Sequence, residues 1–129
     1  HWARLRTLLD GKGVEAAAYL LLGHATIAAD PWTGEARLRL VSHEHREIPE
    51  ADRVSASARH VTWGTAGYMR LLSDALARDL VPTIVHTHPN GRAFFSDQDN
   101  ANEAELARTT RNKRLRGLAS IVLGGDGSV

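Results

Sequence analysis

The stretch that decides the fold runs from Val81 to Asp99 and reads Val-Pro-Thr-Ile-Val-His-Thr-His-Pro-Asn-Gly-Arg-Ala-Phe-Phe-Ser-Asp-Gln-Asp. Its first part, together with Leu80, is rich in β-branched residues and predicts a strand from Leu80 to His88 that Pro89 ends. Its last part begins a polar helix with little apolar face, predicted from Ser96 to about Thr110. The stretch therefore predicts a strand followed by a helix, which is the pattern of an α/β domain.

Similar patterns on either side of this stretch predict the other elements. Val14 to Leu22 is apolar in both alternating sets, which is typical of a strand buried on both faces and equally of a short buried helix. Apolar residues recur at helical spacing from about Thr65 to Asp79. Further patterns predict a helix over Trp2 to Leu9, strands over Arg37 to Val41 and Ala119 to Leu123, and a loop with a short strand over residues 49 to 58. Their order predicts one mixed β-sheet flanked by helices.

The composition suits one globular domain over residues 1–129, with 43% hydrophobic and 24% charged residues. The chain has no cysteine, which excludes a disulfide scaffold, a thiol nucleophile and any cysteine-ligated metal site. A formal net charge of +1 argues against binding to nucleic acid or to a membrane over the whole surface. The longest apolar run, Ala16 to Leu22, is too short to span a bilayer, and no signal peptide is recognisable.

We therefore expect a soluble, cytoplasmic protein. The sequence stops just after turn residues Gly124 to Gly127, which would lead into another strand, so we also expect a domain taken from a longer protein.

Two histidines at the end of the predicted strand suggest a metal site. His86 and His88 are two residues apart, so both rings lie on one face of the strand and can bind one zinc ion. A site with three protein ligands needs one more donor, and Asp99 follows ten residues after Pro89, where the chain can fold back. Two histidines and one carboxylate with an open fourth position form a catalytic zinc arrangement, not a closed structural one.

Taken singly, these residues also have structural interpretations. A lone His-x-His on a strand is more often structural than metal-binding. Ser96 and Asp99 have the spacing of a helix capping box, which is compatible with catalysis because a cap would fix both side chains. We interpret Phe94 and Phe95 as packing residues, and Thr87 as a structural residue that points away from the histidines.

Taken together, the string His-Thr-His-Pro-x6-Ser-x-x-Asp from His86 to Asp99 resembles the signature of the JAMM (MPN+/JAB) metalloproteases. That family also has an upstream glutamate in an apolar segment that ends in Leu-Gly, and Val14 to Gly23 is similar, with Glu15 as its only acid. This chain has alanines and one extra residue where many members have a glycine. The resemblance implies a single JAB/MPN domain with a cytidine-deaminase-like fold.

The resemblance also implies a role for each matched residue. His86, His88 and Asp99 would bind Zn²⁺, with water as the fourth ligand. Glu15 would take a proton from this water and pass it to the leaving amine, and the Ser96 hydroxyl would hydrogen-bond the developing oxyanion. The implied activity is that of a zinc-dependent (iso)peptidase, which hydrolyses the amide bond after the C-terminus of a ubiquitin-like protein in deconjugation or precursor processing.

The same resemblance implies partners and leaves alternatives open. Bacterial JAB domains are similar to components of ubiquitin-like conjugation and anti-phage systems, so a ubiquitin-like substrate and a ThiF-type activating enzyme are the expected partners. One alternative is release of a small group from a sulfur-carrier ubiquitin-like protein. Another is a RadC-like, DNA-associated protein, although such proteins usually carry Asn where this chain has Thr87. A non-catalytic scaffold is disfavoured because every ligand is present.

Several other residues could suggest function but have simpler explanations. His43-Glu44-His45 is a second His-x-His without the proline or the Ser-x-x-Asp, and we interpret it as a solvated strand end. His24 and His60 are isolated and are expected to be structural. The basic run from Arg108 to Arg116 is interpreted as a solvated helix end, with a docking patch for an acidic partner as the alternative. Trp63-Gly64 could be either a substrate-facing loop or core packing.

Overall fold

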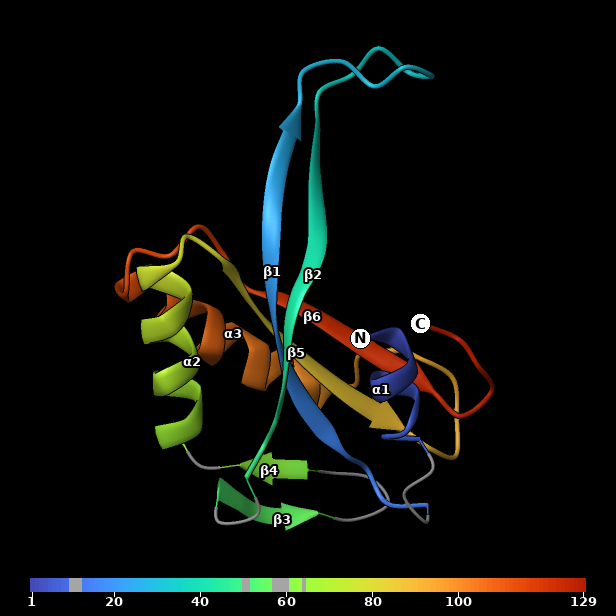
Figure 1. Ribbon diagram of the computed structural model, residues 1–129. Coiled ribbons are helices and arrows are strands. Elements are labelled where there is room, and N and C mark those ends of the chain that lie inside the picture. Colours follow the sequence, from blue (N-terminus) through green and yellow to red (C-terminus); the bar gives the residue numbers. More distant parts are fainter. Residues whose placement is uncertain (10–12, 50–51, 57–60, 64) are drawn as a thin grey trace.

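The structure, a computed structural model, describes residues 1–9, 13–49, 52–56, 61–63 and 65–129. The elements in these ranges are α1 (Trp2–Arg6), β1 (Ala17–Ile27), β2 (Arg37–Glu47), β3 (Arg53–Ala56), β4 (Val61–Trp63), α2 (Thr65–Ala77), β5 (Val81–His88), α3 (Asp97–Asn112) and β6 (Ala119–Gly124). Four strands form one sheet in the order β2-β1-β5-β6, and β3 pairs with β4 separately (Figure 1). Because β5 pairs antiparallel with β1 and parallel with β6, the predicted mixed sheet is confirmed.

The ambiguous apolar segment near the N-terminus is a strand, β1, in the middle of the sheet. Its two alternating sets of side chains pack into two different clusters. Tyr19 and Leu21 join α2 residues such as Leu72 on one face, whereas Ala18 and Leu20 join α1 on the other. The helical alternative is therefore wrong, and the doubly apolar pattern arises because both faces of the sheet are covered.

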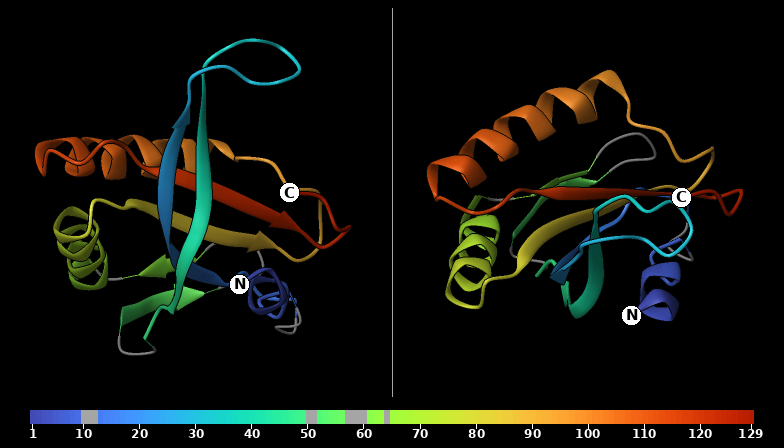
Figure 2. Two further views of the ribbon diagram at one scale, coloured as in Figure 1. Left: turned by 45° about the horizontal axis from the view of Figure 1, so that its top comes forward. Right: turned by 90° about the horizontal axis from the view of Figure 1, so that it is seen from above.

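The helices cover both faces of the sheet, with α2 and α3 on one face and α1 on the other. α1 and α3 lie on opposite sides of β5 and β6 (Figure 2). α2 and α3 contact one another where the Tyr68 hydroxyl donates to the Leu106 carbonyl at 3.1 Å and shares a hydrogen bond with buried Thr110 at 2.6 Å. α3 is as poor in apolar contacts as its sequence predicts, with Leu106 as its partly buried hydrophobic contribution to the core.

Several predicted boundaries differ from the structure. The apolar segment predicted over Val14 to Leu22 is a strand that runs from Ala17 to Ile27, so Glu15 lies just before it. The first helix ends at Arg6, although Leu8 and Leu9 still pack against the core beyond it. α2 ends at Ala77, because Asp79 has a positive φ of 50° that no helix continues through. β2 continues six residues past the predicted end, and its charged second half pairs with β1. Of the predicted loop over 49 to 58, residues 50–51 and 57–58 lie outside the described ranges.

The far ends of β1 and β2 form a hairpin that extends beyond the helices (Figure 1). Its apolar side chains Leu38 and Val41 are exposed, as is Trp32 at its tip.

β5, in contrast, is buried along its whole length because it has a strand on each side and packed layers on both faces. The carboxyl end of β5 lies beside the start of β1 and the end of β6, where Ala17 is opposite His86 and Gly124 is opposite His88. Within the described ranges, no helix has the length and apolar character needed to cross a membrane.

Candidate metal centre

The two histidines of the motif lie at the carboxyl end of β5. The side chains of His86 and His88 are 7% and 11% exposed. Their ring centroids are 5.1 Å apart, as alternation along a strand predicts for rings on one face. The rings are therefore neighbours in a site that is almost closed to solvent.

Asp99 reaches the histidines from the first turn of α3. Ser96 is the N-cap: its Oγ accepts from the Asp99 backbone N–H at 3.2 Å, and its own backbone N–H donates to Asp99 Oδ2 at 2.9 Å. The predicted capping box is thus confirmed, and the Ser96 hydroxyl also donates to Oδ2 at 2.5 Å. Held in this way, the carboxylate has Oδ1 3.5 Å from His86 Nε2 and Oδ2 3.6 Å from His88 Nε2.

The surroundings favour the protonation states that bind metals. Burial lowers the pKa of His86, and the nearby Asp99 carboxylate opposes this only in part. Burial alone would raise the pKa of Asp99, but the hydrogen bonds from Ser96 and the two nearby histidines leave it below its ordinary value. A neutral imidazole and an ionised carboxylate are the forms in which these side chains coordinate a metal ion.

The donor geometry fits one small divalent ion. His86, His88 and Asp99 each offer a ligand atom, and these atoms lie within 4.8 Å of one another. Donors bound to one tetrahedral zinc at 2.0–2.1 Å are about 3.3 Å apart, close to the 3.5 and 3.6 Å between the Asp99 oxygens and the two histidine Nε2 atoms. Among the residues that the structure describes, none forms a hydrogen bond with the buried Nε2 atom of His86, an arrangement that is costly unless something else binds it. These three residues could therefore hold a metal ion.

Glu15 lies beside this group, just before β1. Its side chain is buried, and Oε1 is 3.8 Å from His88 Nε2. The backbone next to it is fixed to β5 by Thr87, whose hydroxyl accepts from the Ala16 N–H at 2.9 Å and whose N–H donates to the Ala16 carbonyl at 2.9 Å. Thr87 is fully buried between the two histidines. The structural role expected for Thr87 therefore includes holding the segment that carries Glu15.

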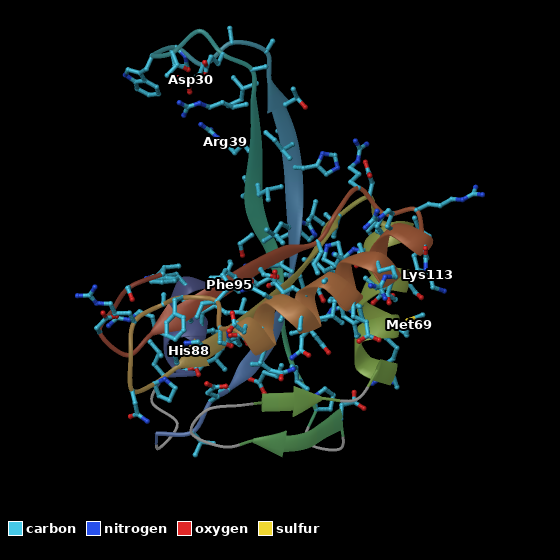
Figure 3. All side chains as sticks on the ribbon, turned by 180° about the vertical axis from the view of Figure 1, so that it is seen from behind. Asp30, Arg39, Met69, His88, Phe95 and Lys113 are labelled. Carbon is cyan, nitrogen blue, oxygen red and sulfur yellow. The ribbon has the colours of Figure 1, made fainter. Side chains whose placement is uncertain are left out.

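Phe94 and Phe95, interpreted from the sequence as packing residues, pack against the two histidine rings and lie outside the core. They are 57% and 39% exposed, and each ring lies edge-on to a histidine ring. The centroids are 4.9 Å apart for His88 and Phe94, and 6.0 Å apart for His86 and Phe95. Figure 3 shows Phe95 and His88 near the start of α3. The reason is that the segment after Pro89 runs across the histidine rings, so its apolar side chains cover the candidate site instead of entering the core.

The other residues considered from the sequence lie elsewhere or pair with other groups. Glu44, between the second pair of histidines, forms ion pairs with Arg46 and Arg78 at 2.6 and 2.5 Å. His24 and Arg116 both contact Asp79, at 3.4 and 3.1 Å. His60 and Gly64, and the side chain of Trp63, lie outside what the structure describes. Phe94 and Phe95 are the site neighbours that sequence reasoning missed, although their position between two candidate ligands of one motif was a usable signal.

Comparison with known families agrees with this geometry. A family model for prokaryotic homologs of the JAB domain matches residues 5–129. A search of the curated proteins finds no match to the chain.

Proposed function

This chain belongs to the family of prokaryotic homologs of the JAB domain, and from that premise we propose that it is a zinc-dependent (iso)peptidase. The proposed substrate bond is the amide after the C-terminus of a ubiquitin-like protein. Family membership supports hydrolysis as the type of reaction. The main support from the structure is the convergence of His86, His88 and Asp99 with the Glu15 carboxylate 3.8 Å from His88.

His86, His88 and Asp99 would hold the metal ion in this proposal. A zinc ion bound there would lower the pKa of a water molecule towards about 7 and polarise the substrate carbonyl. The strand and the capped helix keep the three ligands in place before any metal arrives, so little rearrangement is needed on binding. The chain has no cysteine, so nitrogen and oxygen donors supply the whole ligand set.

Glu15 would act as the general base and then as the general acid. Its carboxylate is buried next to the ligands, where it would accept a proton from the attacking water and return it to the leaving nitrogen. Such proton transfer contributes about 10²- to 10⁴-fold to the rate. Glu15 is therefore the residue whose removal should stop hydrolysis while leaving the three ligands intact.

Ser96 has two possible hydrogen-bond partners in this mechanism. In the present structure its hydroxyl donates to Asp99 Oδ2. To donate to the oxyanion of the substrate, the hydroxyl must turn away from Asp99, while the backbone N–H of Ser96 continues to hold the carboxylate. We propose that Ser96 stabilises the oxyanion in this way.

The substrate and the pathway are proposed from the resemblance of the motif to metalloproteases that act on ubiquitin-like proteins. A ubiquitin-like protein would be the substrate, and a ThiF-type activating enzyme the expected partner in a bacterial conjugation or anti-phage system. The chemistry requires only an amide next to the bound metal. The substrate must therefore be identified separately from the reaction type.

The experiment uses the purified zinc-loaded chain and ubiquitin-like proteins encoded near its gene. Each is prepared with a C-terminal peptide extension and, separately, with an isopeptide-linked lysine peptide. Intact-mass spectrometry should show cleavage at one bond, directly after the ubiquitin-like C-terminus, and the released mass identifies the leaving group. Glu15→Gln should abolish cleavage but keep zinc. Undiminished cleavage by Glu15→Gln, or in a metal chelator, would contradict the mechanism.

A further inference from the structure

We propose that Ser128 is a positioning residue for the candidate metal centre, which it holds in place through the loop that joins two ligands. We call Gly124–Ser128 the C-terminal turn and Pro89–Phe95 the ligand loop, because the latter connects His88 to the helix that carries Asp99. This inference deepens the proposed function, since it rests on a metal ion binding at that site.

The C-terminal turn begins in direct backbone contact with a ligand. Gly124 is opposite His88 in the sheet, and the Gly125 N–H donates to the His88 carbonyl at 3.0 Å. A Cβ atom on Gly125 would lie 2.0 Å from the Pro89 carbonyl oxygen, so only glycine permits this approach. The turn then folds back, with the Gly124 N–H donating to the Ser128 carbonyl at 2.9 Å. This fold brings the Ser128 side chain to the ligand loop.

The Ser128 hydroxyl connects the two segments, and its orientation is fixed. Its proton is donated to Asp126 Oδ1 at 2.5 Å, and the same oxygen accepts from the Ser128 backbone N–H at 3.0 Å. Because a hydroxyl has one proton, its oxygen is then directed as an acceptor towards the ligand loop. It accepts from the Ala93 N–H at 2.7 Å.

A displacement of Ala93 would disturb the candidate site through two groups of residues that follow it in the chain. The next two residues, Phe94 and Phe95, place their rings against His88 and His86. Ser96 follows directly and holds the Asp99 carboxylate through its backbone N–H and hydroxyl. Loss of the hydrogen bond to Ala93 therefore frees the middle of the ligand loop, which connects His88 to the helix that carries Asp99. The Asp99 carboxylate then becomes less well placed relative to the two histidines.

The test compares three variants of the full chain: Ser128→Ala, Ser128→Thr, which keeps the hydroxyl, and Ser73→Ala. Ser73 is the control because its hydroxyl also makes a local hydrogen bond, donating to the Met69 carbonyl at 3.0 Å, but on the exposed side of α2. Zinc dissociation constants are measured on metal-free protein by competition with a chromophoric chelator, and melting temperatures are recorded without metal.

We expect Ser128→Ala to weaken zinc binding about 10-fold, the lower end of the range for residues that orient metal ligands. The zinc dissociation constants of Ser128→Thr and Ser73→Ala should stay within about 2-fold of the wild-type value, as expected when no group that orients a ligand is lost. If Ser128→Ala does not fold, Asp126→Asn tests the same point, because it weakens the acceptor that orients the hydroxyl, and zinc binding should again weaken.

Two outcomes separate this inference from the proposed function. An unchanged zinc affinity in folded Ser128→Ala, with only a lower melting temperature, would overturn the positioning role and leave the proposed peptidase untouched. Tight zinc binding by the wild type that Ser128→Ala weakens, without hydrolysis of any ubiquitin-like substrate, would support the positioning role while the proposed function fails.

Discussion

The chain has two His-x-His sequences on two strands of one sheet, and they differ in what surrounds them. His86 and His88 lie at the end of the central strand β5, where Asp99 arrives from a helix. His43 and His45 lie on the edge strand β2. The register of β2 shifts between Glu44 and Ser42, so His43 is an extra residue in a bulge that interrupts regular alternation.

Burial of a ring nitrogen does not separate the two pairs. Both His86 and His45 have a buried Nε2 atom that forms no hydrogen bond within the described ranges. The acid between the second pair, Glu44, is already paired with two arginines. In the part of the chain that the structure describes, three metal-binding side chains converge only at the end of β5. The comparison teaches that the neighbours supplied by other elements, and not the spacing of the histidines, create a candidate metal site.

The largest expected effect comes from exchanging one histidine in each pair for alanine. His86→Ala should weaken zinc binding by more than about 100-fold, because loss of a ligand costs more than loss of a residue that merely orients one. His45→Ala should leave the affinity unchanged. Chelator competition measures both. Equal losses of zinc affinity in the two variants would contradict a difference in metal binding between the two pairs of histidines.

The residue between the two histidines of β5, Thr87, gives the next largest expected effect. Thr87→Val removes the hydroxyl that accepts from the Ala16 N–H and so loosens the segment carrying Glu15. We expect hydrolysis to slow about 10- to 100-fold with little change in zinc affinity, because misplacement of a catalytic group affects the rate most strongly. Steady-state kinetics and chelator competition give the two readouts.

Two controls make the Thr87 experiment specific. Thr87→Ser keeps the hydroxyl and should retain most of the rate. Thr83→Val removes an equally buried hydroxyl from the same strand, away from the histidines, and should retain it as well. A rate loss of the same size in Thr83→Val would assign the effect to the strand as a whole.

Acid should destabilise the metal-free protein partly through His86. Burial lowers its pKa in the folded state, so below the ordinary value of 6.5 the unfolded chain takes up this proton more readily. Stability is therefore unaffected by this group above pH 6.5 and falls as the pH drops below it. The melting temperature should fall less between pH 7.5 and 5.5 in His86→Gln than in the wild type. An equal or larger fall in the variant would refute this assignment.

The smallest expected effect concerns Glu44. Its hydrogen bonds with Arg46 and Arg78 lower its pKa from 4.5 to about 2. Their contribution to the free energy of unfolding is therefore present above pH 4.5 and is lost as the pH falls towards 2. Since the side chain is 33% exposed, solvent screening limits the effect. Glu44→Gln should reduce the free energy of unfolding by about 0.5–1 kcal/mol, and by less in 1 M salt. Urea denaturation at two salt concentrations measures this, and a salt-independent loss would argue against the ion pairs.

Local patterns predicted most of the fold and the three side chains that converge at the candidate site. Alternation placed His86 and His88 on one face, and the Ser96–Asp99 spacing predicted the cap, because both depend on residues close in sequence. The second half of β2 was missed because its charged residues resemble a strand end, whereas Arg46 pairs with Asp74 of α2. The contact of Ser128 with Ala93 had no sequence signal, since it depends on two distant turns meeting.

The most direct test of the central claim is a crystal structure of the zinc-loaded chain with anomalous data collected at the zinc edge. We expect one strong peak about 2.0–2.2 Å from a ring nitrogen of His86, a ring nitrogen of His88 and a carboxylate oxygen of Asp99. No peak should lie beside His43 or His45. A peak on β2, or density for these three side chains without a shared ion at saturating zinc, would contradict the account.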